Sequence, residues 1–201
     1  MEKTEDRFKS LGSVKQSYMN EFLVTCPKCG KDAVVHNYNG YFPGDGKLTC
    51  SNCMFSETVK DNIRYRMIVK RNCDNCGKAI NVEIPNQKEP LTQVTVPCPH
   101  CGITRTFEPR NEPYKIQYKS TGATSDPLFN LPLWLQTEIK GNLFWAYNRR
   151  HLHDIKTYVQ AKLRERQSEG YTTMVERLPK FIKEAKNREA ILKAIEQLDR
   201  R

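Results

Sequence analysis

Cys26-Pro27-Lys28-Cys29-Gly30 is the first of four Cys-x-x-Cys segments in this 201-residue chain, and these segments decide its fold. The first two pairs are separated by 20 residues, and the last two pairs are separated by 21 residues. Two such pairs supply the four thiolates of one tetrahedral zinc site. The sequence therefore predicts two zinc ions as cofactors, with all eight cysteines as ligands: Cys26, Cys29, Cys50, Cys53, Cys73, Cys76, Cys98 and Cys101.

Disulfides, a redox pair and an iron–sulfur cluster are the competing explanations for these cysteines. Residues 1–20 are charged and polar, without the apolar stretch of a secretion signal. We therefore expect a reducing, cytoplasmic compartment, in which paired cysteines more often bind metal than form disulfides. A redox motif needs one pair, so four pairs favour metal. The sequence contains no run of 18 apolar residues, and we expect no membrane partner.

Glycine follows three of the four pairs, at Gly30, Gly77 and Gly102. The tight turn around a metal requires a positive φ after the second cysteine, and glycine adopts it at low cost. Met54 stands at this position in the second pair. That turn is less typical, although both of its cysteines are present.

Short alternating segments predict β-structure around both cysteine clusters. We expect strands at 33–35, 47–49, 55–59, 63–69, 80–84, 94–96 and 103–107. The first cluster repeats in the second with an offset of 47 to 48 residues. A duplicated module is the simplest explanation of this repeat.

The segments Cys26-Pro27-Lys28-Cys29-Gly30 and Cys98-Pro99-His100-Cys101-Gly102 resemble the motifs of tandem four-cysteine zinc-ribbon proteins. The resemblance covers about residues 21–110 and implies two small β-modules with paired turns at hairpin tips. Segments 133–136 and 143–148 are similar, more loosely, to bacterial zinc-ribbon proteins of unassigned activity. Zinc ribbons occur in transcription factors, polymerase subunits, ribosomal proteins and interaction modules. The resemblance therefore specifies a fold and leaves the activity open.

The predicted fold class is α+β, with two small zinc-ribbon β-modules followed by a β-hairpin and a helical C-terminal domain. The expected parts are a polar N-terminal arm (1–20), ribbon 1 (21–60), ribbon 2 (61–110), a linker (111–127) and an aromatic hairpin with helices (128–201). Gly141-Asn142, between two aromatic segments, predicts the hairpin turn, with a helix as the alternative. Asn148 is expected to cap a helix that reaches about Gln167. Further helices are expected after Pro179 and Asn187.

Basic residues exceed acidic ones by 33 to 23, which gives a net charge of +10. Each zinc ion with four thiolates contributes about −2, so the loaded protein is nearer about +6. A dense basic cluster precedes the third cysteine pair and comprises Arg64, Tyr65, Arg66, Lys70 and Arg71. Basic residues around an aromatic ring suit phosphate contact and base stacking. The same pattern also protects an edge strand by charge.

Two functions from different classes fit these features. The first is a non-enzymatic zinc protein that contacts nucleic acid through basic ribbon and helix surfaces. The second is an adaptor that docks a larger protein complex through the ribbons and the aromatic C-terminal domain. Trp134 and Trp145 are the candidate protein-binding residues of the second function, because both tryptophans of the chain lie in that domain.

Catalytic motifs are not evident in the sequence, which contains neither a phosphate-binding loop nor a nucleophile elbow. His151 and Asp154 form the one cluster of histidine with an acid, three residues apart on the predicted helix. A metal-dependent nuclease could use such a pair. An exposed helix start with a weak His–Asp pair is the simpler interpretation, and we do not expect an enzyme.

Overall fold

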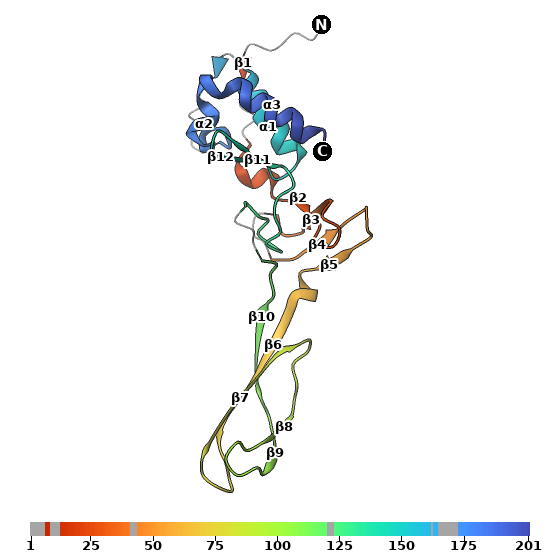
Figure 1. The fold of residues 1–201 in the computed structure, drawn as a ribbon, viewed down its shortest axis with the longest axis vertical. Helices are drawn as coiled ribbons and strands as arrows, with labels where there is room; N and C mark the ends of the chain where they lie inside the picture. Colours follow the sequence, from red (N-terminus) through yellow and green to blue (C-terminus); the bar gives the residue numbers. More distant parts are fainter. Residues whose placement is uncertain (1–6, 9–12, 41–43, 120–122, 162, 165–172) are drawn as a thin grey trace. The chain divides into compact units, whose positions relative to one another are not determined.

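In the computed structural model, the chain folds into two compact units (Figure 1). The structure describes residues 7–8, 13–40, 44–119, 123–161, 163–164 and 173–201. Unit 1 comprises Met1–Val59 and Tyr118–Arg201, and unit 2 comprises Lys60–Gln117. Unit 1 is thus interrupted in sequence by unit 2. The α+β class predicted from the sequence is confirmed, with small sheets around both cysteine clusters and the helices near the C-terminus.

A four-stranded antiparallel sheet carries the first cysteine cluster, in the order β2-β3-β4-β5. Burial alternates along β3, where Ala33, Val35 and Asn37 point inward, as expected for a strand with one face on a core. The strands are β2 (Glu21–Thr25), β3 (Asp32–Asn37), β4 (Gly46–Thr49) and β5 (Ser56–Thr58).

The free edge of β2 is hydrogen-bonded by the C-terminal half of the chain. The amide of Leu23 donates to the carbonyl of Tyr147 at 2.7 Å, and the amide of Trp134 donates to the carbonyl of Leu23 at 2.9 Å. The amide of Thr25 donates to the carbonyl of Pro132 at 2.9 Å. The first cysteine module and the helical part therefore form one unit, which differs from the separate domains expected from the sequence.

The predicted hairpin is present, but its first strand begins later than expected. The strands are β11 (Gln136–Ile139) and β12 (Asn142–Trp145), which pair antiparallel. Lys140 and Gly141 form the turn with φ of +49° and +75°, one residue earlier than predicted, because Asn142 already pairs with Ile139. Residues 131–135, expected as a strand of this hairpin, instead contact β2 through the bonds described above.

Helices follow the hairpin, and the predicted cap is confirmed: Asn148 Oδ1 accepts from the amide of His151 at 2.9 Å. Helix α1 ends at Gln160 rather than near Gln167, and residues 165–167 lie outside the described residues. Figure 1 shows α1 and α3 packed side by side. The helical elements among the described residues of unit 1 are α1 (Arg149–Gln160), α2 (Lys180–Lys183), α3 (Arg188–Asp199), and the short 3₁₀ turns Lys15–Tyr18, Val175–Arg177 and Ala185–Asn187. Two short strands, β1 (Arg7–Phe8) and β13 (Leu163–Arg164), pair in parallel.

Parts of the expected arm and linker contribute to the core of unit 1. Tyr18, from the segment read as a polar arm, is 2% exposed. Asp126, from the segment read as a linker, is also buried, and its Oδ1 accepts from the amides of Leu128 and Phe129 at 2.8 Å each. Its Oδ2 accepts from the amide of Leu131 at 2.7 Å. Three amides thus converge on one carboxyl group and fix the entry of this loop into the core.

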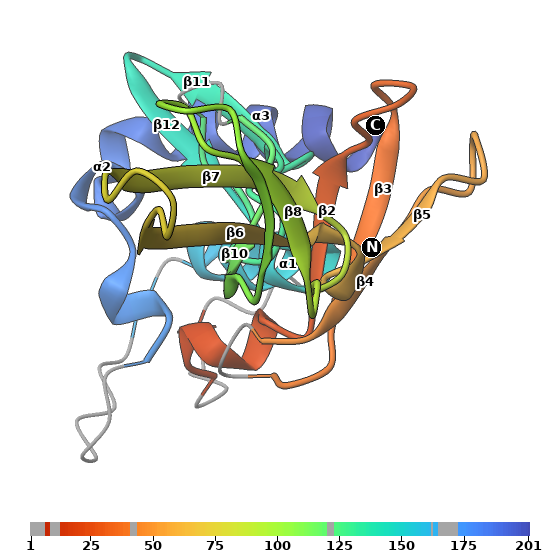
Figure 2. The same cartoon turned by 90° about the horizontal axis from the view of Figure 1, so that it is seen from below.

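Unit 2 has two small sheets and a small core. The sheets are β10-β6-β7 and β8-β9, and Figure 2 shows β6 and β7 running alongside each other. The strands are β6 (Ile63–Asn72), β7 (Ala79–Gln87), β8 (Val94–Pro97), β9 (Thr104–Phe107) and β10 (Arg110–Lys115). Two of the five residues that form the main core cluster are cysteines: Val69, Cys73, Ile80, Val96 and Cys98. Metal binding substitutes for part of a hydrophobic core in such a module.

Residues 111–115, expected as the start of a linker, belong to β10, which pairs antiparallel with β6. Pro113 lies within this strand, opposite Tyr65. Proline is tolerated there because β10 is an edge strand, whose outer amides need no partner in the sheet.

Membrane-spanning character is not found in the described helices. The longest, α1 and α3, have 12 residues each, and none is long and apolar enough to cross a bilayer.

Candidate metal centres

Each cysteine pair lies in the turn of a β-hairpin, and all four turns have the same backbone pattern. The pairs follow β2, β4, β6 and β8 in that order. The amide of the first cysteine donates to the carbonyl five residues later: Cys26 to Lys31, Cys50 to Phe55, Cys73 to Lys78 and Cys98 to Ile103, at 2.7–2.8 Å. This bond closes the turn and directs both thiols to the same side.

Positive φ follows the second cysteine in every turn. Gly30, Gly77 and Gly102 have φ of +72°, +70° and +77°. Met54, at the corresponding position of the second turn, has φ of +59°. Its side chain is 82% exposed. The second turn therefore has the same shape as the others, with a non-glycine residue held in the left-handed region that disfavours side chains.

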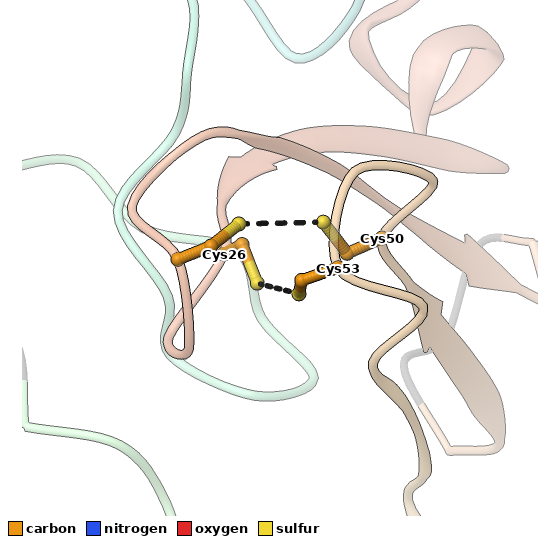
Figure 3. Close-up of side chains that lie close together, drawn as sticks. Cys26, Cys50 and Cys53 are labelled. Carbon is orange, nitrogen blue, oxygen red and sulfur yellow. Dashed lines mark hydrogen bonds between the residues drawn. The ribbon is translucent and has the colours of Figure 1, made fainter.

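The four sulfur atoms of each cluster are spaced as the corners of a tetrahedron. Across the first cluster, Cys26 Sγ lies 3.7 Å from Cys53 Sγ, and Cys29 Sγ lies 3.6 Å from Cys50 Sγ. Figure 3 shows the thiols of Cys26 and Cys53 facing each other from two separate turns. In the second cluster the separations Cys73–Cys101 and Cys76–Cys98 are both 3.8 Å.

Zinc fits both clusters. A regular tetrahedron with metal–sulfur bonds of about 2.3 Å has sulfur–sulfur edges of about 3.8 Å. The separations in both clusters match that value, and all eight cysteines are free thiols rather than disulfides. Four thiolates fill the tetrahedral coordination shell, which is typical of a structural site that leaves no position for water or substrate. The two clusters therefore fit two zinc ions, as the sequence predicted.

In each centre, an asparagine of one turn donates a hydrogen bond to a cysteine sulfur of the other turn. Asn52 Nδ2 donates to Cys29 Sγ at 3.5 Å, and Asn75 Nδ2 donates to Cys101 Sγ at 3.6 Å. Both asparagines directly precede the second cysteine of their own pair. Asn52 and Asn75 were not predicted from the sequence, although their shared position in Cys-x-Asn-Cys was a signal for this contact.

These contacts favour the thiolate form of one cysteine in each cluster, whereas burial and the neighbouring thiols raise the pKa of Cys53 and of Cys76. A backbone hydrogen bond from Lys31, with a further contribution from Asn52, lowers the pKa of the Cys29 thiol to about 6. A backbone hydrogen bond from Ile103, supported by Asn75, lowers the pKa of Cys101 to about 6 as well. Hydrogen bonds to the charged sulfur stabilise it relative to the neutral thiol.

The basic cluster predicted from the sequence is divided between the two faces of β6. Side chains alternate along a strand, so Arg64, Arg66 and Lys70 lie on one face and Tyr65 and Arg71 on the other. Arg66, Lys70 and Arg71 are exposed, whereas Arg64 and Tyr65 are half-buried.

Two residues of this cluster have local contacts. The guanidinium of Arg64 donates from Nη1 to the backbone carbonyls of Asp61 and Ile63, at 2.6 and 2.8 Å. The guanidinium of Arg66 lies over the ring of Tyr114, 5.7 Å from its centroid. Arg64 is therefore held along its own strand, while Arg66 remains exposed on the face shared with Tyr114.

The tryptophans predicted as protein-binding residues are both half-buried and pack against the core of unit 1. Trp134 Nε1 is buried and has no hydrogen-bond partner among the described residues. Trp145 packs against Tyr147 with their ring centroids 4.9 Å apart. Neither ring forms a broad exposed aromatic face.

The sequence interpretation of His151 and Asp154 as an exposed, weakly paired helix start is wrong. They are 4% and 6% exposed, and each contacts Tyr18 instead of the other. The hydroxyl of Tyr18 donates to Asp154 Oδ2 at 2.6 Å, and the ring of Tyr18 stacks on His151 with a centroid separation of 4.5 Å. Tyr18 is 136 residues away from Asp154 in the chain, so neither contact was visible in the helix pattern alone.

Comparison with known proteins does not identify a family or a relative for this chain. No family model, no curated protein and no solved structure matches the chain. The function must therefore be argued from the residues themselves.

Proposed function

We propose that this protein is a non-enzymatic, cytoplasmic zinc-ribbon protein that binds nucleic acid through the exposed basic residues of unit 2. The zinc-ribbon assignment is supported by paired cysteine turns at hairpin tips and by two closed four-thiolate centres. Closed centres stabilise a fold and offer no open position for catalysis. A reducing compartment would keep all eight thiols available for metal.

A hollow on the surface of unit 2 is the observation that carries the nucleic-acid proposal. It has a volume of about 240 Å³ and lies between β6 and the segment 108–112. Its cations are Lys70, Arg71 and Arg110, and its acids are Glu108 and Glu112. Arg110 forms an ion pair with Glu112 at 2.8 Å. The remaining exposed cations, Lys70 and Arg71, leave β6 on opposite faces, but both line the hollow and suit the negative charge of a phosphate backbone.

Arg66 extends this surface along β6. It lies directly opposite Glu112 across the β6–β10 pair, on the same face as Lys70. The mixture of cations and acids favours weak, salt-sensitive contact with the backbone over base-specific readout. Single-stranded nucleic acid fits such a surface, because its flexible backbone can follow separated cations.

The test measures binding of a fluorescent single-stranded oligonucleotide, about 16 nucleotides long, to the zinc-loaded full chain at several salt concentrations. Arg66→Ala, Lys70→Ala and Arg71→Ala together are expected to weaken binding about tenfold, and each lost contact should reduce the salt slope by about 0.7. The matched control replaces three exposed lysines elsewhere in unit 2: Lys78, Lys88 and Lys115. Equal loss in both variants, or parental binding by the first, would refute the proposal.

An adaptor function is our second proposal, and it is supported by exposed side chains on the first zinc module. Met54 is 82% exposed at the second turn, and Tyr38 is 63% exposed beyond β3. Exposed methionine and tyrosine suit protein contact. If the adaptor function holds, Met54→Ala with Tyr38→Ala should abolish capture of a protein partner from cell extract, while the unit 2 variant retains it.

A further inference from the structure

A cavity in unit 1, away from both cysteine clusters in sequence, is used by neither proposal above. Its volume is about 290 Å³, at the lower end of the range for small-molecule sites. At about 30 Å³ per water molecule, this volume corresponds to about ten non-hydrogen atoms. Its walls are mainly apolar and come from β12, α1 and the 174–182 segment, including Trp145, Ile155, Met174 and Ile182.

The charged side chains that line the cavity are all cationic among the described residues. They are Lys15 and Arg177, and no carboxylate lines the cavity with them. Lys15 Nζ lies 5.4 Å from the ring centroid of Trp145 and 5.5 Å from that of Tyr147. The two rings hold the ammonium group beside the apolar wall. Positive charge next to apolar surface is the complement of a small anion with an apolar body.

His151 contributes a neutral polar group to the same wall. Its Nδ1 accepts from the amide of Tyr147 at 3.2 Å, which places the ring proton on Nε2. Burial, with a smaller effect of Lys15, lowers its pKa to about 4. At neutral pH His151 is therefore a hydrogen-bond donor without charge, and it adds specificity for an oxygen acceptor.

We propose that this cavity binds a small carboxylate with an apolar body, such as a medium-chain aliphatic acid. The apolar chain packs against Ile155, Met174 and Ile182, and the carboxylate faces Lys15 and Arg177. This site lies in unit 1, so the inference is independent of nucleic-acid binding by unit 2.

Calorimetric titration of the zinc-loaded full chain with octanoate tests the proposal. Saturable binding of one octanoate per chain is expected, with 1-octanol at least about tenfold weaker because it lacks the charge. Lys15→Met and Arg177→Met should each weaken octanoate about tenfold and leave octanol unchanged. The control is Lys180→Met, which removes an exposed charge three residues from Arg177 that does not line the cavity.

A further variant tests the cavity without removing a charge, so the proposal remains testable if the charge variants do not fold. Leu143 lines the cavity and is 42% exposed, so Leu143→Trp adds bulk at the surface without disturbing the core. It should reduce binding of both octanoate and octanol. Failure of octanoate to saturate, equal affinity for octanol, or parental binding by the Lys15, Arg177 and Leu143 variants would each overturn the proposal. Loss of nucleic-acid binding in the unit 2 variant should leave octanoate affinity unchanged.

Discussion

Replacing Met54 with glycine is expected to tighten zinc binding at the first centre. Met54 has φ of +59°, and a non-glycine residue in this region costs about 1–2 kcal/mol. Its side chain is 82% exposed, so little packing is lost on removal. The greater conformational freedom of glycine in the unfolded chain offsets about 0.5–1 kcal/mol of the gain from relieving the positive φ. The net gain is about 0.5–1 kcal/mol, which corresponds to about a two- to fivefold lower zinc dissociation constant because metal binding and folding are coupled.

Competition with a chromophoric zinc chelator measures this change, with the second centre of the same chain as an internal reference. The reverse substitution, Gly30→Ala, lies in the other turn of the first centre, at φ of +72°. No heavy atom lies within 4 Å of the added Cβ, so its effect reports backbone conformation alone. Gly30→Ala should weaken zinc binding about fivefold, for a cost of about 1 kcal/mol.

If backbone conformation controls zinc affinity, Met54→Gly and Gly30→Ala should shift that affinity in opposite directions. If Met54→Gly left zinc affinity unchanged or weakened it, the argument from positive φ would be refuted. An unaffected Gly30→Ala variant would refute it equally, because no steric contact could mask the effect. Gly77→Ala provides the same comparison at the second centre.

Three further outcomes are expected. Burial holds the pKa of His151 near 4 rather than 6.5, so the unfolded chain protonates first, and about 3 kcal/mol of stability present above pH 6.5 is lost by pH 4. His151→Asn keeps an acceptor near the position of Nδ1 and should remove the loss of stability between pH 6.5 and pH 4, as measured by urea titrations. Equal pH dependence of the parent and the variant would contradict this prediction. Asp126→Ala should lower the free energy of unfolding by about 3 kcal/mol, since three amides lose a charged acceptor; the half-exposed Asp199→Ala is the control, and a difference below about 1 kcal/mol between them would count against the argument. Removal of zinc by a chelator should abolish hydrogen-exchange protection in residues 60–117 but spare the core of unit 1, and retained protection in unit 2 would show that its core suffices without metal.

Local features were predictable from the sequence because their causes are local. Cysteine spacing indicated both metal centres, and glycine after the pairs indicated turns with positive φ. The Met54 turn shows the limit of that rule: the residue type was unfavourable, yet the hairpin and the four ligands impose the same φ. Asn148 was predictable as a cap because its acceptor lies three residues away.

Features that depend on distant residues were not predictable in this way. The bond from the amide of Trp134 to the carbonyl of Leu23 joins segments more than one hundred residues apart, and it unites two expected domains. Proline and glycine suggested a linker around Pro113, but the pairing of β10 with β6 uses an edge position that proline tolerates. His151 and Asp154 had the pattern of a helix surface, and only Tyr18, near the other end of the chain, accounts for their burial.

The interruption of unit 1 by unit 2 has a consequence for the order of events during synthesis on the ribosome. Residues 60–117 contain every strand and ligand of unit 2, so this unit can complete its fold as soon as its last strand has emerged and zinc has bound. The strand β2 emerges earlier, yet one of its edges stays unpaired until residues 132–147 are translated. The nascent chain therefore carries an open strand edge while unit 2 matures, which is the interval in which a chaperone or a second chain would find β2 accessible.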